Sequence, residues 1–134
     1  MKIALAQIKP VLGNINENLA IHRDMFQQAE EKGADLLVFP ELSLTGYTLK
    51  DMVADVALHP GNHTAFRELK KWSRSMSLVV GFAEEKERGI YTNSAAYIEQ
   101  GEIKHIHRKV FLPTYGMFEE RKFFGTGRTF TPFL

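Results

Sequence analysis

Short apolar runs alternate with amphipathic segments along the first part of the chain. Residues 3–8 form an apolar run that ends before Pro10, and residues 36–39 and 78–83 form two further runs of this kind. Runs that are almost continuously apolar, rather than strictly alternating, are typical of strands that are buried on both faces or paired in parallel. These three runs therefore predict three strands of a buried sheet.

Two amphipathic segments separate the predicted strands. In the first segment, apolar residues recur at near-helical spacing, and either Asn14 or Asn16 can cap the N-terminus of the helix. Gly33 is suited to the C-terminal cap of the same helix. Residues 62–76 predict a second amphipathic helix, with the apolar side chains of Phe66, Leu69 and Trp72 on one side.

The remainder of the chain predicts a hairpin followed by a loop region. Residues 84–89 predict a charged turn, and residues 92–98 and 102–111, joined by Gln100-Gly101, predict an antiparallel hairpin. From residue 112 to residue 134 the periodicity fades, so we expect loops with at most one helical turn. This order of elements predicts one α/β domain over residues 1–134, with a mixed sheet.

Composition excludes several classes of function. The formal net charge of +1 argues against a polyanion-binding surface, so no nucleic-acid partner is expected. No apolar run approaches the roughly 18 residues of a membrane helix, and the N-terminus lacks a signal-peptide pattern, so no membrane partner is expected. The chain contains no cysteine, which removes disulfides, thiol nucleophiles and thiolate ligands and favours a cytoplasmic location.

Glu41 is the first candidate for chemistry. It follows a predicted buried strand, where α/β proteins tend to keep their reacting groups, and Pro40 and Gly46 shape the turn around it. A partly buried carboxylate at such a position could serve as a general base. A solvated glutamate at the end of a strand is the ordinary alternative. Gly81, inside another predicted strand, indicates close backbone packing.

Lys109 is the second candidate. Strand alternation predicts that Ile103, His105, His107 and Lys109 share one face. The ordinary alternative for the lysine is that its ammonium reaches solvent. A His-x-His pair on one face can bind zinc. However, no third ligand stands at a suitable spacing, and the lysine would repel a cation, so we expect no metal.

Adjacent glutamates supply the third candidate. Glu119 and Glu120 lie in an aromatic loop and are followed by Arg121 and Lys122, so a solvated, charge-balanced pair is the alternative. Tyr91 and Asn93, at the entrance of the predicted hairpin, are interpreted as structural.

Three stretches together resemble the nitrilase superfamily of carbon-nitrogen hydrolases. They are Phe-Pro-Glu-Leu-Ser-Leu-Thr-Gly-Tyr at 39–47, Arg-Lys-Val-Phe-Leu-Pro at 108–113, and the segment 115–124. The resemblance covers essentially the whole chain, and its wording is similar to amidases and to the glutaminase domain of glutamine-dependent NAD synthetases. It implies a four-layer α-β-β-α sandwich, of which this chain supplies about half, and amide C–N hydrolysis through a cysteine acyl-enzyme.

The resemblance also implies roles for individual residues. Glu41 takes the proton of the thiol, Lys109 stabilises the oxyanion, and Glu120 holds the lysine, since the register of the match favours Glu120 over Glu119. It further implies that Tyr47, Tyr115 and Phe118 contact the substrate, and that no cofactor is needed. We expect the two carboxylates and the ammonium to converge at one end of the sheet.

The missing cysteine separates this chain from that family pattern. The resemblance implies that residues 1–134 correspond to the part of the domain that precedes the cysteine strand. The expected consequences are an inactive isolated chain, a small-molecule amide substrate only when the domain is completed, and a homo-oligomer that covers the open sheet. The alternative is a non-catalytic fragment or assembly partner from a truncated or split gene.

Overall fold

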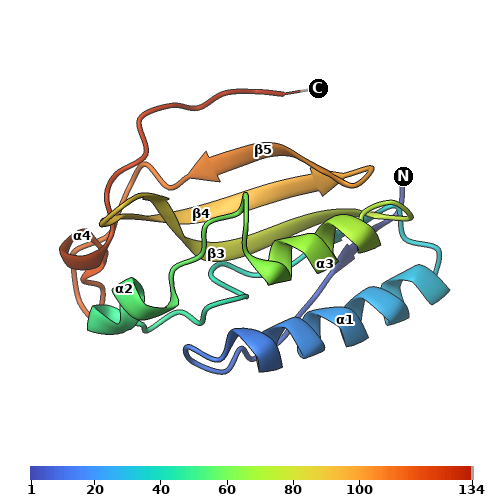
Figure 1. The fold of residues 1–134 in the computed structure, drawn as a ribbon, viewed down its shortest axis with the longest axis horizontal. Helices are drawn as coiled ribbons and strands as arrows, with labels where there is room; N and C mark the ends of the chain where they lie inside the picture. The colour runs from blue at the N-terminus through green and yellow to red at the C-terminus, as the bar shows by residue number, and fades with distance from the viewer. Residues whose placement is uncertain (134) are drawn as a thin grey trace.

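The computed structural model describes residues 1–133, and within them five strands form one mixed sheet (Figure 1). The strands lie in the sheet in chain order: β1 (Ile3–Leu5), β2 (Leu36–Val38), β3 (Ser77–Glu87), β4 (Ile90–Glu99) and β5 (Glu102–Arg108). Strands β1, β2 and β3 pair in parallel, and β3, β4 and β5 pair antiparallel. The mixed sheet and the hairpin are therefore confirmed, although β1 and β2 are shorter than predicted.

Two helices, α1 (Ile15–Glu31) and α3 (Thr64–Trp72), cover one face of this sheet (Figure 1). The main core lies between the two layers, where Phe66 and Phe82 meet edge to face with their ring centroids 4.8 Å apart. The shorter elements are η1 (Lys50–Met52), α2 (Val53–Val56) and α4 (Glu120–Phe123). The last of these is the single helical turn predicted in the C-terminal loops. No helix within residues 1–133 has the length and apolar character required to cross a membrane.

The caps of α1 follow from its flanking residues. Asn14, one of the two predicted candidates, is the N-cap: its Oδ1 accepts the backbone N–H of Glu17 at 3.1 Å. Beyond the last turn, Gly33 adopts a left-handed φ of 66° and donates its N–H to the carbonyl of Glu30. The residues at the two caps therefore explain where the helix begins and ends.

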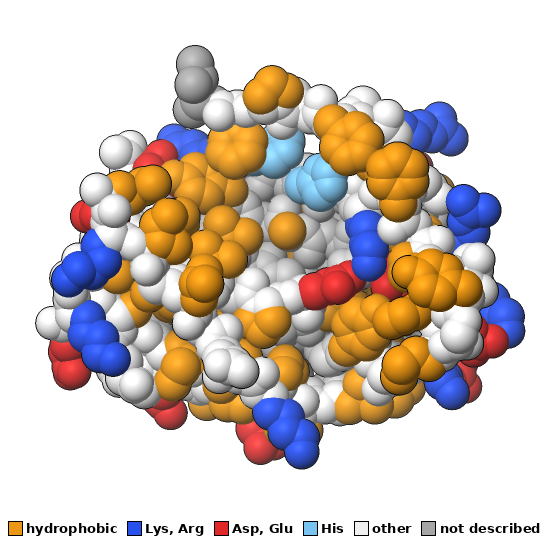
Figure 2. All heavy atoms as spheres, turned by 180° about the vertical axis from the view of Figure 1, so that it is seen from behind, with side chains coloured by type: hydrophobic (Ala, Val, Ile, Leu, Met, Phe, Trp, Pro, Cys, Tyr) orange, Lys and Arg blue, Asp and Glu red, His pale blue; other side chains and the backbone are white. Residues whose placement is uncertain are grey.

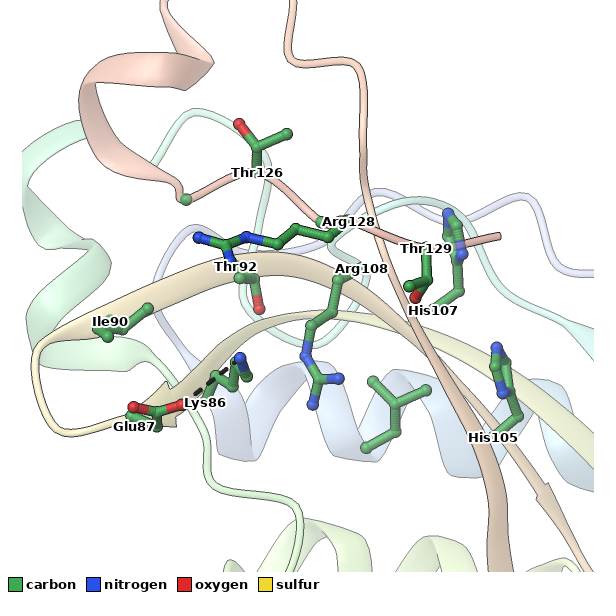
Figure 3. A pocket seen from close by; sticks show the side chains of 13 residues that line it. Lys86, Glu87, Ile90, Thr92, His105, His107, Arg108, Thr126, Arg128 and Thr129 are labelled. Atoms are coloured by element: carbon green, nitrogen blue, oxygen red, sulfur yellow. Dashed lines mark ion pairs between the residues drawn. The ribbon is translucent and has the colours of Figure 1, made fainter. Parts of the chain in front are cut away.

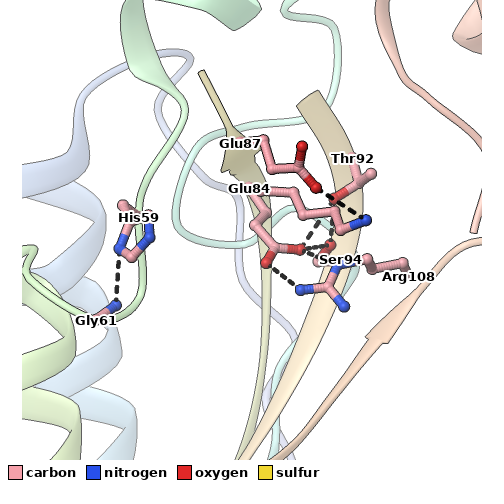
Figure 4. Close-up of polar contacts among 8 residues, drawn as sticks. His59, Gly61, Glu84, Glu87, Thr92, Ser94 and Arg108 are labelled. Carbon is pink, nitrogen blue, oxygen red and sulfur yellow. Dashed lines mark hydrogen bonds and ion pairs between the residues drawn. The ribbon is translucent and has the colours of Figure 1, made fainter. Parts of the chain in front are cut away.

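Strand β3 corrects one prediction. It continues to Glu87, so residues 84–87, predicted as part of a charged turn, are strand. Glu84 is 2% exposed on the helix-covered side, where Arg108 Nε and Nη2 donate to its carboxylate at 2.8 and 2.6 Å (Figure 4). The hydroxyls of Thr92 and Ser94 donate at 2.9 and 2.7 Å. The strand can continue through Glu84 because the buried carboxylate is fully hydrogen-bonded. The prediction of a turn had assumed a solvated carboxylate at this position.

Strand β5 corrects a second prediction. The register shifts opposite Tyr97 and Ile98, so Ile98 pairs with Ile103 whereas Tyr97 pairs with His105. Ile103 therefore packs against the core and does not share a face with His105 and His107. The irregularity adds one residue to β5. Residues of β5 before it, such as Ile103, therefore face the opposite side from the one that simple alternation predicts.

The face of the sheet opposite the helices is hollowed in the middle (Figure 2). Histidine and hydrophobic side chains gather at its rim, with carboxylates and lysine or arginine side chains nearby (Figure 2). The C-terminal segment crosses this side: Phe130 stacks on His107 and Phe133 on His105, with centroid distances of 5.8 and 4.4 Å. The expected shared face of the two histidines is confirmed.

Helix α1 also carries two fully buried polar residues, Asn18 and His22. Asn18 accepts the N–H of Val11 and donates to the carbonyls of Val11 and Leu44. His22 Nδ1 lies 2.7 Å from the carbonyl oxygen of Asn18, and Nε2 lies 2.9 Å from Ser43 Oγ. Because a carbonyl only accepts, Nδ1 carries the proton, and Nε2 accepts the hydroxyl proton of Ser43.

The buried His22 makes the stability of the fold sensitive to acid. Burial lowers the pKa of His22 to about 4, and the hydrogen bond to the Asn18 carbonyl opposes this only partly. The unfolded chain takes up the proton near pH 6.5, so between these values unfolding binds a proton and acid favours it. At pH 5 the expected loss is about 2 kcal/mol relative to pH 7.

Urea unfolding at pH 7 and pH 5 measures this loss. His22→Gln should remove this pH-dependent part, and His59→Gln, on an exposed loop, should retain it. An equal pH dependence in the wild type and His22→Gln would contradict the assignment.

Candidate functional site

Glu41 stands on a tight turn that follows β2. The turn spans residues 41–45, and Leu42, which is buried, adopts a left-handed φ of 52° that non-glycine residues rarely occupy. On the facing strand β3, a Cβ on Gly81 would lie 2.5 Å from the Leu42 nitrogen and 2.6 Å from the Pro40 oxygen. The predicted close packing at Gly81 is confirmed, and it is the Glu41 turn that packs there.

Backbone and side-chain hydrogen bonds fix this turn on β3. The N–H of Leu44 donates to the Gly81 carbonyl at 3.0 Å, and the N–H of Ala83 donates to Thr45 Oγ1 at 3.1 Å. The N–H of Ser43 closes the turn on the Pro40 carbonyl at 3.2 Å. Glu41 therefore projects from a backbone that is held on both sides.

The structure brings the three predicted catalytic residues together. Lys109, directly after β5, places its Nζ 2.7 Å from Glu41 Oε1 and 3.0 Å from Glu120 Oε1. The side chains of Glu41, Lys109 and Glu120 are 43%, 30% and 8% exposed, so the cluster runs from the surface into the protein. One ammonium thus lies between two carboxylates, so the three groups converge as expected.

The electrostatics of the cluster keep the ammonium charged. Burial alone would lower the pKa of Lys109, but hydrogen bonds to the carboxylates of Glu41 and Glu120 outweigh it and raise the pKa above its ordinary value. Tyr47 donates its hydroxyl to Glu120 Oε1 at 2.9 Å. Burial, followed by this bond to Glu120, raises the pKa of Tyr47 to about 12. The phenol therefore stays a donor across the physiological range.

The two adjacent glutamates have different surroundings. Glu120 opens α4, and its N–H donates to the Pro113 carbonyl at 3.2 Å. Glu119 is exposed and forms an ion pair with Lys122. Within residues 1–133, Glu120 Oε2 is the one buried side-chain oxygen or nitrogen without a hydrogen-bond partner. The geometry therefore places Glu120, and not Glu119, in the cluster.

The three aromatic residues predicted to contact substrate are placed unequally. Tyr47 is part of the cluster, and Phe118 lines a small hollow of about 60 Å³ beside Tyr47 and Glu120. Tyr115 is 73% exposed and packs edge-on against Phe118, with ring centroids 5.7 Å apart, but it does not line that hollow. Their contacts with a substrate remain predictions.

Asn93 is a site residue that sequence reasoning missed by treating it as structural. Its Nδ2 donates to Glu41 Oε1 at 2.6 Å, and its backbone carbonyl accepts the N–H of Lys109 at 2.8 Å. The signal was present in the alternation of β4, which turns Thr92 and Ser94 toward Glu84 and Asn93 to the opposite face. The alternation alone did not predict that Asn93 contacts Glu41, because this contact depends on where the Glu41 turn lies in the fold.

Two cavities lie near the ends of the strands. One, of about 320 Å³, is bordered by Glu41, Asn93, His107 and Lys109 and floored by small side chains of β3 and β4. The larger, of about 590 Å³, lies between β5 and residues 125–129, and none of the three clustered residues lines it (Figure 3). Glu41 and Lys109 therefore face the smaller cavity, whereas Glu120 lines the hollow beside Tyr47.

The arrangement suits proton transfer and the stabilisation of negative charge. A carboxylate at Glu41 can accept a proton, and a fixed ammonium at Lys109 can stabilise an oxyanion. Within residues 1–133, no group of three or more histidine, aspartate or glutamate side chains has the geometry to hold a metal ion. The chain itself contains no thiol.

Comparison with known proteins finds relatives that match most of this chain. The glutamine-dependent NAD(+) synthetases of Acinetobacter baylyi and Thermotoga maritima are each 36% identical to the chain, over 126 and 129 residues. These matches cover 94% and 95% of this chain but 23% and 22% of the synthetases, so the chain spans less than a quarter of the length of these curated relatives.

Solved structures extend the comparison to the fold. A mutant of the amidase from Nesterenkonia sp. AN1, with acrylamide added at its active-site cysteine, is 30% identical with a TM-score of 0.83, and the match covers 100% of this chain and 52% of the amidase. The α/β half of a nitrilase-type sandwich is thus confirmed. A family model described as carbon-nitrogen hydrolase matches residues 2–134. The chain belongs to the carbon-nitrogen hydrolase family.

Proposed function

We propose that this chain supplies the proton-transfer and oxyanion-stabilising part of a site that hydrolyses the C–N bond of a small amide. The observation that carries the proposal is the Lys109 ammonium held between the carboxylates of Glu41 and Glu120. Relatives whose names specify dependence on glutamine support the side-chain amide of glutamine as the substrate. The amidase neighbour supports the same bond type.

The proposed reaction needs a cysteine thiol from outside these 134 residues. Glu41 accepts the thiol proton, and the thiolate adds to the amide carbonyl carbon, whose oxygen becomes an anion beside Lys109. Collapse of this intermediate expels ammonia, which takes the proton, and leaves a thioester. Glu41 then accepts a proton from water as the hydroxide attacks the thioester, and the carboxylic acid and the thiol are released.

The other residues of the cluster hold these groups in place. Glu120 and Glu41 fix Lys109 from two sides, and Asn93 fixes the Glu41 oxygen that faces the ammonium. Tyr47 fixes Glu120 by donating to the same oxygen that Lys109 contacts. The positions of the base and of the cation are thereby set before the substrate arrives.

The purified 134-residue chain is expected to release no ammonia from glutamine or from simple amides. The reason is that the chain contains no cysteine to form the acyl-enzyme. A coupled ammonia assay measures this directly. Turnover that disappears in Glu41→Gln would contradict the expectation, because it would require another nucleophile within the chain.

A chimera tests the positive half of the proposal. In it, this chain replaces the matched residues of the Acinetobacter baylyi synthetase, and glutamine-dependent ammonia release is measured. Glu41→Gln and Lys109→Ala are each expected to lower kcat by about 10²-fold or more, as removal of a general base or an oxyanion donor does. Glu119→Gln is the matched control, since Glu119 contacts Lys122 and lies outside the cluster. A folded chimera insensitive to Glu41→Gln would sink the proposal.

A second candidate function is assembly without chemistry. The absence of cysteine favours it, as do the exposed apolar side chains of Phe111 and Met117 beside the cluster. We propose that the chain forms a homo-oligomer in either case, because an open sheet face favours association. Sedimentation velocity measures the oligomer, and a stable monomer that binds no hydrophobic dye would exclude it.

A further inference from the structure

His22 contacts the chain on either side of Glu41. Its ring stacks on Phe39, two residues before Glu41, with centroids 4.0 Å apart and planes inclined by 23°. Its Nε2 accepts the hydroxyl of Ser43, two residues after Glu41, at 2.9 Å. A single buried side chain of helix α1 therefore contacts residues that precede and follow the candidate base in the sequence.

We propose that His22 is a positioning residue for Glu41, acting through Phe39 and Ser43. The inference rests on the proposed function, in which Glu41 is the base of the amide-hydrolysing site. His22 itself does not touch the cavity that faces Lys109.

Hydrogen bonds attach two consecutive residues of the turn to α1. The Ser43 hydroxyl has one proton, and the Gly81 carbonyl at 3.3 Å is a more distant acceptor than Nε2. The next residue, Leu44, is held through its carbonyl by Asn18 Nδ2 at 2.9 Å. The turn is thus fixed to a 17-residue helix, which is a more rigid support than a loop.

The turn needs such support because its own backbone is strained. Leu42 holds a left-handed φ of 52°, a conformation that residues with a Cβ rarely adopt and that persists only when the surroundings impose it. In front, the Glu41 carboxylate is held by Asn93 and Lys109 alone among the contacts within residues 1–133. Loss of the contacts that His22 makes with Phe39 and Ser43 would let the turn relax and separate the Glu41 carboxylate from the Lys109 ammonium.

The ordinary interpretation of a buried, fully hydrogen-bonded histidine is that it only stabilises the core. The two interpretations differ in what they predict for Lys109. A purely stabilising histidine leaves the native Lys109–Glu41 contact unchanged when it is replaced, whereas a positioning histidine weakens that contact in the molecules that remain folded.

The test measures proton exchange of the Lys109 ammonium by ¹H–¹⁵N NMR in the full 134-residue chain, at pH 6 and low temperature. Lys109→Arg assigns the signal. Glu41→Gln gives the reference for complete loss of one carboxylate partner, with exchange about two- to fivefold faster. Ser43→Ala, which removes only a hydroxyl, and His22→Leu, which keeps similar bulk, are expected to reach at least half of that acceleration. His22→Gln, which keeps an acceptor for Ser43, should restore most of the slow exchange.

Phe26→Leu is the matched control, because Phe26 is a buried residue of α1 whose ring packs against Trp72 and which forms no hydrogen bond with the turn. It should lower the melting temperature and leave the exchange rate unchanged. Wild-type exchange in both Ser43→Ala and His22→Leu, with Glu41→Gln still accelerated, would overturn the role of His22 and leave the proposed function intact. Wild-type exchange in Glu41→Gln as well would overturn both, because the Lys109–Glu41 contact itself would then be absent.

Discussion

Arg108→Ala is expected to lower the free energy of unfolding by about 3–5 kcal/mol, since it leaves the carboxylate of Glu84 buried without a charged partner. Glu84 is 2% exposed, and Arg108 supplies two of the four hydrogen bonds that reach its oxygens. The remaining hydroxyls of Thr92 and Ser94 are neutral and cannot balance the charge. Urea unfolding at pH 7 measures the loss.

Two further variants make this result specific. Arg128→Ala removes the same kind of side chain from the exposed C-terminal segment and should change stability by less than about 0.5 kcal/mol. The double variant Glu84→Gln/Arg108→Met removes both charges and keeps an acceptor for Thr92 and Ser94. It should regain most of the stability lost in Arg108→Ala, and a double variant as unstable as the single one would disprove the charge argument.

Gly81→Ala is expected to displace the Glu41 turn as well as destabilise the fold. The added methyl group would lie 2.5 Å from the Leu42 nitrogen and 2.6 Å from the Pro40 oxygen, and backbone atoms cannot move aside as a flexible side chain can. Overpacking of this kind costs roughly 1–3 kcal/mol, and we expect the upper end. Since a shift of about 1 Å in a reacting group can cost on the order of 10²-fold in rate, kcat of the chimera should fall by about that factor.

Gly125→Ala is the control for this substitution. A Cβ at Gly125 would meet its nearest atom, the Tyr91 carbonyl oxygen, at 3.4 Å, which is ordinary contact. Thermal unfolding and ammonia release should therefore change little. A Gly81→Ala chimera with unchanged kcat would show that the turn tolerates displacement from β3.

The parts of the fold and site that were predictable are those set by local pattern. The apolar runs gave the strands, and residue type together with the resemblance selected Glu41, Lys109 and Glu120 before their distances were known. The choice of Glu120 over Glu119 came from the register of the resemblance, and it is Glu120 that contacts Lys109. Composition alone does not separate two adjacent glutamates.

The parts that were not predictable depend on contacts between distant residues. Glu84 appeared to belong to a charged turn because its partner, Arg108, lies 24 residues away. Ile103 was assigned to the wrong face because an irregularity in β5 is a property of strand pairing, not of the strand's own sequence. Asn93 contacts Glu41, and His22 contacts Ser43 in the Glu41 turn, at sequence separations that no local period encodes.

The order of the strands has a consequence for the time course of folding. Each strand pairs with the next one along the chain, and β3, β4 and β5 are joined by short turns, so much of the sheet forms from contacts of small sequence separation. Such contacts form early in folding, whereas the Lys109–Glu41 contact closes 68 residues. The cluster is therefore expected to assemble after the rate-limiting step. Loss of its ion pairs would then appear mainly as faster unfolding, with the folding rate almost unchanged.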